Sequence, residues 1–163
     1  MPLTMSREAE EQYDTWMAAA VEQAKLAEQA GDVPIGAVIV REGKIIAAAH
    51  NRRIIDADPT AHAEMLAIRQ AAAAVGDWRL TGCTLAVTLE PCCMCAGAIV
   101  LARIGTLVYG AADPKAGAVD TLYRLCGDAR LNHRVEVVSG VLADECGRLL
   151  SEFFRTQRET GKK

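Results

Sequence analysis

Residues 84–95, with the sequence TLAVTLEPCCMC, decide the fold of this 163-residue chain. The first six of them, 84–89, form an apolar run of the length of a buried strand. Pro91 follows almost at once, and proline is tolerated where a helix begins because its missing N–H does no harm there. A short helix from about Cys93 to Arg103 is therefore expected. The stretch predicts a strand that leads directly into a helix.

The residues on either side of this stretch extend the alternation of strands and helices. Apolar residues recur at helical spacing from Tyr13 to Ala24, and Gly31 marks the end of that helix. The other predicted elements are a β-hairpin of residues 35–40 and 44–50, a helix over 63–75 that Gly76 ends, strands at 106–109 and 135–139, and a last helix with Asp144 as its N-cap and Cys146, Leu149, Leu150 and Phe153 on one face.

This order of elements predicts an α/β fold with three layers. We expect a central mixed sheet of about five strands that is covered by helices on both faces, within one domain spanning residues 1–163. A chain of this length buries roughly 70% of its unfolded surface. The segment between the last two strands is long and contains a helix-compatible patch at 122–125, and long internal loops are often functional.

Composition and charge exclude several classes of protein. Hydrophobic residues make up 51% of the chain and charged residues 24%, which is typical of a soluble globule and argues against disordered and fibrous proteins. No apolar run approaches the roughly 18 to 20 residues that span a bilayer, and the acidic first twenty residues do not resemble a signal peptide. We therefore expect a cytoplasmic protein without a membrane partner. The net charge of -3 predicts no general basic field, so any anionic partner must be bound locally.

The six cysteines are expected to be thiols or metal ligands, since a chain of this size with a core and no export signal does not need a disulfide framework. His62-Ala63-Glu64 and Pro91-Cys92-Cys93-Met94-Cys95 match the H-x-E and P-C-x-x-C patterns of zinc nucleobase deaminases. One imidazole and two thiolates are good zinc ligands, and the two-residue gap lets Cys92 and Cys95 reach one ion from a single helical turn, with Cys93 pointing elsewhere.

Three protein ligands leave the fourth tetrahedral position open, as in a catalytic zinc site. Glu64 is then the expected proton carrier beside the metal. The alternative is a structural site with a fourth protein ligand, or a redox pair made by the C-x-x-C residues alone. The candidates for that fourth ligand are Cys83, Cys126, Cys146, His50 and His133, of which the cysteines are expected to pack as small apolar groups.

Four stretches together resemble the family of bacterial tRNA-specific adenosine deaminases. They are residues 58–64, 88–98, 113–115 and 131–136, and the resemblance extends from about Trp16 to Arg158. The resemblance implies a cytidine deaminase-like fold and one Zn²⁺ per chain. It implies hydrolytic conversion of adenosine to inosine at the wobble position of a tRNA anticodon, by a cytoplasmic homodimer that binds the anticodon stem-loop.

The resemblance also assigns roles residue by residue. His62, Cys92 and Cys95 correspond to the zinc ligands, and Glu64 corresponds to the proton shuttle. The positions that correspond to substrate contacts are Asn51 for the target base, Asp113 for the ribose 2′-hydroxyl, Phe154 for the anticodon pocket, and Lys115, Arg155 and Arg158 for phosphates. Without the family, Asn51 and Asp113 would read as turn residues and the three cations as solvated surface charges.

Three positions depart from the family pattern, namely Cys93, Ala112 and Asp120. Ala112 brings no charge to the substrate loop, and Asp120 brings a negative charge where a small residue is frequent. Two other functions remain open. The first is deamination of a free base or nucleoside of the guanine or cytosine type with the same zinc site, against which the stretches after Gly110 argue. The second is a zinc-stabilised scaffold without catalysis.

Overall fold

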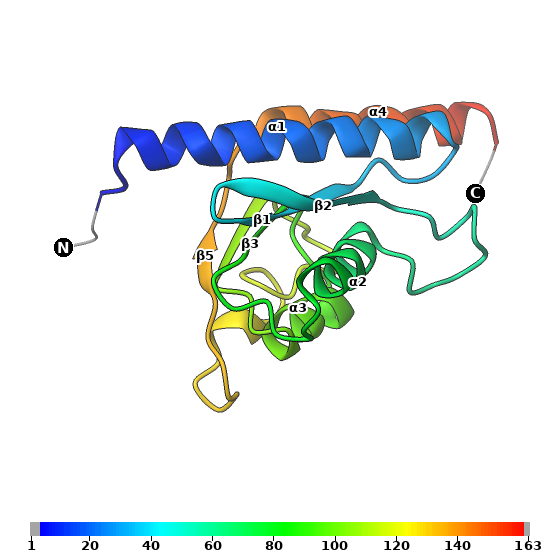
Figure 1. Cartoon of the computed structure of the whole chain (residues 1–163). Helices are drawn as coiled ribbons and strands as arrows, with labels where there is room; N and C mark the ends of the chain where they lie inside the picture. The colour runs from blue at the N-terminus through cyan, green and yellow to red at the C-terminus, as the bar shows by residue number, and fades with distance from the viewer. Residues whose placement is uncertain (1–3, 162–163) are drawn as a thin grey trace.

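A five-stranded sheet lies between two layers of helices in the computed structural model, which describes residues 4–161. Figure 1 shows α1 and α4 on one face of the sheet and α2 and α3 on the other. The elements are α1 (Arg7–Gln29), β1 (Gly36–Arg41), β2 (Lys44–His50), α2 (Ala63–Val75), β3 (Thr84–Leu89), α3 (Cys93–Leu101), β4 (Thr106–Ala111), the 3-10 turn η1 (Leu125–Gly127), β5 (Glu136–Val138) and α4 (Ala143–Glu159). The predicted three-layer α/β/α fold is confirmed.

The sheet is mixed, as predicted, with the strand order β2-β1-β3-β4-β5. β1 pairs in antiparallel fashion with both β2 and β3, whereas β3, β4 and β5 run parallel to one another. Parallel neighbours need a crossover connection, and α3 supplies it between β3 and β4. The carboxyl end of β3 therefore continues directly into the turn that precedes α3.

Alternation along the strands gives each face of the sheet its own core. Val38 of β1 packs with Met17 of α1 on one face, whereas its neighbour Ile39 packs with Ile99 of α3 on the other. All four side chains are fully buried. Both helical layers are thus held by apolar contacts through the same central strands.

Three predicted helix and strand bounds are confirmed to the residue. α2 covers 63–75 and ends at Gly76, whose left-handed backbone (φ 75°) suits glycine. β3 covers 84–89 and β2 covers 44–50. α3 ends two residues before the predicted Arg103, because Arg103 itself adopts a left-handed conformation with φ 61°.

One prediction about the second half of the chain is wrong. Asp144 is not an N-cap but lies in the first turn of α4, and Leu142, with φ 52°, occupies the N-cap position. The helix-compatible patch at 122–125 contributes only its last residue, Leu125, to the short 3-10 turn η1. The segment between β4 and β5 is otherwise a chain of turns.

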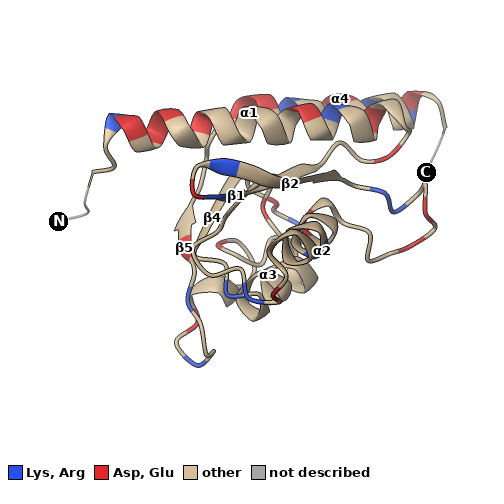
Figure 2. Ribbon diagram, viewed as in Figure 1, with Lys and Arg blue, Asp and Glu red and all other residues tan. Residues whose placement is uncertain are grey.

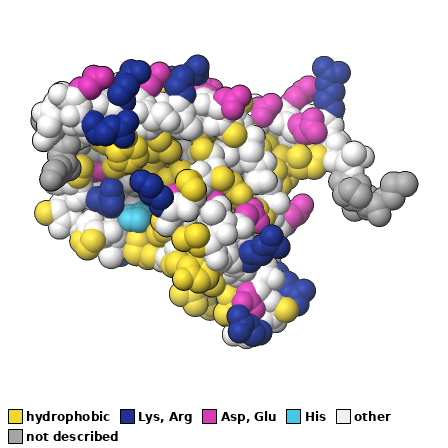
Figure 3. Space-filling model, turned by 180° about the vertical axis from the view of Figure 1, so that it is seen from behind, with side chains coloured by type: hydrophobic (Ala, Val, Ile, Leu, Met, Phe, Trp, Pro, Cys, Tyr) yellow, Lys and Arg dark blue, Asp and Glu magenta, His cyan; other side chains and the backbone are white. Residues whose placement is uncertain are grey.

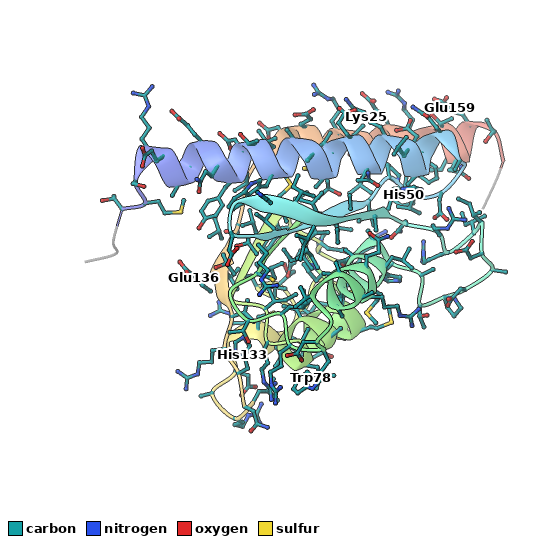
Figure 4. The ribbon with its side chains drawn as sticks, viewed as in Figure 1. Lys25, His50, Trp78, His133, Glu136 and Glu159 are labelled. Carbon is teal, nitrogen blue, oxygen red and sulfur yellow. The ribbon has the colours of Figure 1, made fainter. Side chains whose placement is uncertain are left out.

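A polar side-chain contact joins α1 to the sheet. His50 of β2 places Nδ1 3.2 Å from Oε1 of Gln23 in α1, and Figure 4 shows His50 below that helix. The same figure places Lys25 and Glu159 along the outer layer and Trp78 at the opposite end of the molecule. Among residues 4–161, none of the helices is long and apolar enough to cross a membrane.

Candidate active site

Two helix beginnings bring the predicted metal ligands together. His62 is the N-cap of α2 and Cys92 is the N-cap of α3, and Cys95 lies in the first turn of α3. The Nδ1 atom of His62 is 3.7 Å from Sγ of Cys92 and 3.5 Å from Sγ of Cys95. Residues 30 positions apart in the sequence thus place three donor atoms around one point, as the motif predicted.

The spacing of these donor atoms fits a zinc ion. Tetrahedral bonds of about 2.3 Å to sulfur and about 2.05 Å to nitrogen place the sulfur and nitrogen atoms about 3.6 Å apart. The two observed distances are 3.7 and 3.5 Å, and all three donor atoms lie within 4.8 Å of one another. The donor set and its size therefore suit Zn²⁺.

The alternative with a fourth protein ligand does not form. Within residues 4–161, the group of His62, Cys92 and Cys95 is the one cluster of three or more potential ligands. Cys93 is exposed and points away from it, as predicted. The other three cysteines, Cys83, Cys126 and Cys146, are buried, and burial raises the pKa of each thiol, to about 12 for Cys126 and Cys146.

The protein groups of the cluster favour a negative charge on Cys92. Hydrogen bonds from the Cys95 thiol and from His62 lower the pKa of Cys92 to about 3 against the cost of burial. The contact with Cys92 in turn raises the pKa of His62. The pKa of Cys95 is raised, first by the neighbouring Cys92 and then by burial. A cation bound at this cluster would therefore lie next to the Cys92 thiolate and the His62 imidazole.

Glu64 lies beside this cluster as the second residue of α2. Its side chain is only 4% exposed, and this burial raises the pKa of the carboxyl group. Glu64 does not belong to the three-residue ligand group, although it faces the same pocket as His62 and Cys92. A buried carboxylate that faces a metal site without being needed as a ligand can carry protons.

Asn51 connects the β1 and β2 hairpin to the start of α2. The residue is 2% exposed, its backbone N–H donates to the carbonyl of Ile35 (3.0 Å), and its Oδ1 accepts from the N–H of Ala63 (2.9 Å). The amide oxygen therefore already accepts one hydrogen bond, which orients the side chain, and the N–H₂ group is the donor that Asn51 can offer to the pocket.

One pocket collects most of the predicted substrate-contacting residues. Asn51, Asp113, Lys115, Phe154 and Arg158 line it together with His62, Glu64 and Cys92. Phe154 is 46% exposed, and its ring stands edge-on to that of Phe153, with the ring centres 5.5 Å apart. Arg155 is exposed on α4 but does not line the pocket. Figure 3 shows basic side chains gathered near a histidine and a hydrophobic stretch on one face.

Asp113 has the turn role that its sequence context allowed. Its Oδ1 accepts from the N–H groups of Lys115 (3.0 Å) and Ala116 (3.2 Å), so the carboxylate shapes the turn around Pro114. The residue is half-buried and also lines the pocket, so this contact does not remove it from the surface that a substrate would meet.

Two charged pocket residues were not predicted. Arg53 lies in the loop after β2, and no motif distinguishes it from the neighbouring Arg52. Glu90 follows β3 and is 2% exposed. Burial would raise its pKa, but hydrogen bonds from Thr121 and from backbone N–H groups outweigh this and lower it. The acidic residue that ends an apolar run at Glu90 is a sequence signal for a special position, but it does not reveal which groups the carboxylate contacts.

An α/β/α fold with a buried glutamate beside a histidine and two cysteines defines the class of zinc-type nucleobase deaminases. In agreement, residues 11–158 match the family described as MafB19-like deaminase. A tRNA-specific adenosine deaminase of Bacillus subtilis (strain 168) is 55% identical over 151 residues, which are 93% of this chain and 94% of that protein. The chain belongs to the family of tRNA-specific adenosine deaminases.

Solved structures of deaminases are also similar to this chain. One comes from a study of A-to-I editing by tRNA:A34 deaminases at the wobble position of transfer RNA. It has a TM-score of 0.81 and 46% identity and covers 83% of this chain and 99% of its own. An X-ray structure of guanine deaminase from Bacillus subtilis has a TM-score of 0.59 and 42% identity over 66% of each chain.

Proposed function

We propose that this chain converts adenosine to inosine by hydrolytic deamination at the wobble position of a tRNA anticodon. The observation that carries the proposal is the buried carboxylate of Glu64 at a pocket that also contains His62 and Cys92. The membership of the chain in the tRNA-specific adenosine deaminase family supports adenosine in RNA as the substrate. A tRNA substrate also supports the expected cytoplasmic location.

We infer that His62, Cys92 and Cys95 hold one Zn²⁺ per chain. The distances between their donor atoms support this ligand set. When bound, zinc supplies a Lewis acid that makes water a nucleophile near neutral pH. Cys95 is fully buried, whereas His62 and Cys92 are partly accessible from the pocket, so the open side of the ligand set faces the substrate.

Glu64 moves the protons of the reaction. A carboxylate oxygen of Glu64 takes a proton from the attacking water and delivers it to a ring nitrogen of the adenine. The oxygen of water bonds to C6, and Glu64 carries the remaining proton of that oxygen to the amino group. The bond between C6 and the amino nitrogen then breaks, so that ammonia leaves and a carbonyl remains at C6. The burial of Glu64 excludes bulk water that would otherwise exchange with the transferred proton.

Asn51 and Asp113 recognise the nucleoside around the reacting ring. Because the oxygen of Asn51 accepts from Ala63, its N–H₂ group donates to an acceptor nitrogen of the purine. One oxygen of Asp113 supports its own turn, and the other accepts from the ribose 2′-hydroxyl. The base must leave its stack to enter, which a single-stranded anticodon loop makes less costly than a duplex.

The outer part of the site holds the RNA backbone and the neighbouring bases. Lys115 and Arg158 line the pocket, and Arg155 extends the basic surface on the same helix as Arg158. We propose that these three cations contact phosphates and that Phe154 packs against an anticodon base. A local basic rim of this kind reconciles an anionic substrate with a net charge of -3.

A panel of substrates tests the proposed function. The panel contains an anticodon stem-loop RNA with adenosine at the wobble position, free adenosine, guanine and cytidine, with ammonia release as the readout. We expect conversion of the stem-loop only. Conversion of free guanine or cytidine would favour the alternative that the chain deaminates a free base or nucleoside. The similarity to the guanine deaminase structure is the observation that supports this alternative. No ammonia from any substrate with a zinc-loaded protein would favour the scaffold.

Replacement of the proton carrier separates catalysis from folding. Glu64→Gln keeps the size of the side chain and removes its basic oxygen, so turnover of the stem-loop should fall by a factor of about 100 or more. Zinc content, measured by atomic absorption, should stay at that of the unchanged chain, because Glu64 is not a ligand. A variant that retained most of its turnover would remove Glu64 from the reaction.

We further propose that the chain acts as a homodimer, as the family resemblance implies. Large apolar side chains that remain exposed support association, with Leu101 at 69% and Ile54 at 62% exposure. Sedimentation velocity of the purified chain is the measurement that checks this. A sedimentation coefficient of the 17.4 kDa monomer across micromolar concentrations would contradict it.

A further inference from the structure

We propose that Glu90 is a positioning residue that fixes the pocket-lining loop 112–121 against the turn that carries the metal ligands. The inference rests on the proposed function and names the side chain that orders its substrate loop. Glu90 directly precedes Pro91 and Cys92, so the residue that organises the loop is attached to the metal site.

The carboxylate of Glu90 accepts five hydrogen bonds from this loop. Oε1 accepts from the backbone N–H of Asp113 (3.1 Å) and from the hydroxyl of Thr121 (2.5 Å). Oε2 accepts from the backbone N–H groups of Val119 (3.2 Å), Asp120 (2.9 Å) and Thr121 (3.1 Å). Both ends of the loop, at Asp113 and at 119–121, therefore close on one side chain.

These hydrogen bonds alone offset the cost of burying the negative charge of Glu90. Glu90 is 2% exposed, and among the ion pairs of residues 4–161 none includes it. Hydrogen bonds to an ionised acceptor are stronger than those between neutral groups. A buried carboxylate without a cation needs these N–H donors, so the loop conformation that presents them is strongly preferred over others.

The backbone around Glu90 strengthens the same connection. The N–H of Glu90 donates to the carbonyl of Ala111 (2.8 Å), and the carbonyl of Pro91 accepts from Ala118 (2.9 Å). A Cβ atom at Gly117 would collide with the carboxyl group of Glu90, so the loop can approach this closely because residue 117 has no side chain. The loop is shaped to surround the carboxylate.

A second contact holds the loop from the floor of the sheet. The hydroxyl of Tyr109 in β4 donates to Oδ2 of Asp120 (2.6 Å), while the N–H of Asp120 donates to Glu90. Asp120, which departs from the family pattern, thus has a partner inside the fold. Its negative charge is directed at Tyr109 and not at the substrate.

The loop ordered in this way carries the groups that meet the substrate. Asp113, Lys115 and Ala116 line the same pocket as His62 and Cys92. Glu90 touches none of the proposed reacting atoms, so its effect on the reaction passes through these residues. Loss of Glu90 should therefore weaken substrate binding while it leaves the ligands and Glu64 in place.

The test is the Glu90→Gln variant of the full zinc-loaded chain. Glutamine keeps the size but replaces one acceptor oxygen with an N–H₂ donor that faces N–H groups of the loop. We expect KM for the anticodon stem-loop to rise about tenfold or more. We expect kcat to stay within about threefold and the zinc content to be unchanged. Asp128→Asn, the same change in a turn away from the pocket, should leave all three values unchanged.

Amide hydrogen exchange reports on the loop independently of the reaction. The N–H groups of Asp113, Val119, Asp120 and Thr121 should exchange about tenfold faster in Glu90→Gln, with no change in α1. Thr121→Val removes only the hydroxyl contact and is a milder second variant, which should raise KM by about threefold.

The outcomes separate this proposal from a purely structural role and from the proposed function. Partial unfolding lowers the amount of active enzyme and hence kcat, so a lower kcat with an unchanged KM would overturn the positioning role. Faster exchange of the loop with an unchanged KM would overturn it as well. If the unchanged chain converts no RNA, the proposed function fails, and the exchange rates alone support or overturn the connection between Glu90 and the loop.

Discussion

Three cysteines within four positions have three different environments. Cys92 begins α3 beside the pocket, Cys93 is exposed, and Cys95 is fully buried one turn further along. The helical backbone explains the difference, because residues three apart share a face and adjacent residues do not. The pair that can reach His62 is therefore selected by helix geometry.

This geometry predicts which thiols the metal needs. Cys95→Ser should lose most of the bound zinc, because serine is a poor zinc ligand at this position, whereas Cys93→Ser should keep about one zinc per chain. Inductively coupled plasma mass spectrometry of the purified variants measures both. Equal loss of zinc from the two variants would contradict the ligand assignment.

The site residues that could be predicted from the sequence are those whose roles depend on short spacings within a motif. His62, Glu64, Cys92 and Cys95 follow from two local motifs, so the candidate site was predictable at its centre. The role of Glu90 depends on N–H groups about 23 to 31 positions away in the sequence, which no local pattern reveals. A buried acceptor whose partners are backbone groups leaves no trace in the residue types of those partners.

At the scale of elements, β4 and the loop that follows it are joined by the contact between Tyr109 and Asp120. Burial raises the pKa of Tyr109 above its ordinary value of 10.0, and the hydrogen bond that it donates to Asp120 raises it further. The unfolded chain loses this proton as pH passes 10, whereas the folded chain keeps it. The stabilisation is therefore complete below pH 10 and declines as pH rises above it.

The Tyr109→Phe variant isolates this contribution. The difference in free energy of unfolding between the unchanged chain and Tyr109→Phe should be constant up to about pH 9. It should then shrink by up to about 1.4 kcal/mol per pH unit above 10. Urea denaturation followed by circular dichroism gives the values. Tyr123→Phe, at an exposed position, is the matched control, and a difference that stayed constant to pH 11 would exclude this role for Tyr109.

Element boundaries were predictable where a residue with a strong backbone preference marks them. Gly76 ends α2 and Pro91 precedes α3, and both helices begin and end at or close to the predicted positions. The N-cap of α4 was predicted wrongly. Leu142 occupies that position in a left-handed conformation, which disfavours most side chains. Tertiary packing of Leu142 against the α1 core overrides the preference of Asp144 for a capping position.

At the scale of the whole molecule, the negative charge is unevenly distributed. Figure 2 shows acidic residues repeated along α1, in the outer helical layer. The pocket lining contains the basic residues Arg53, Lys115 and Arg158 beside the acidic residues Glu64, Glu90 and Asp113. Interactions between exposed charges fall off within about 8 to 10 Å at physiological salt, so a polyanion in the pocket is affected most by the charges that line it.

Salt titration of RNA binding tests this arrangement. Affinity for the stem-loop should fall steeply as salt rises, and each lost phosphate contact should reduce the slope of log affinity against log salt by about 0.7. The triple change Lys115→Gln, Arg155→Gln and Arg158→Gln should reduce it by up to about 2. Arg7→Gln on the outer side of α1 is the control. An equal slope for the triple variant and the unchanged chain, measured by fluorescence anisotropy, would remove these cations from the RNA contact.

Different elements supply the metal ligands and the rest of the pocket lining, and this division affects how the substrates of related proteins can diverge. His62, Glu64 and Cys92 belong to the beginnings of two helices that the central strands hold in place. Another part of the pocket lining comes from α4 and from the loop after β4, which contribute no group to the ligand cluster. A lineage can therefore inherit the reaction unchanged while substitutions, insertions or a different C-terminal helix select another base or another carrier of that base.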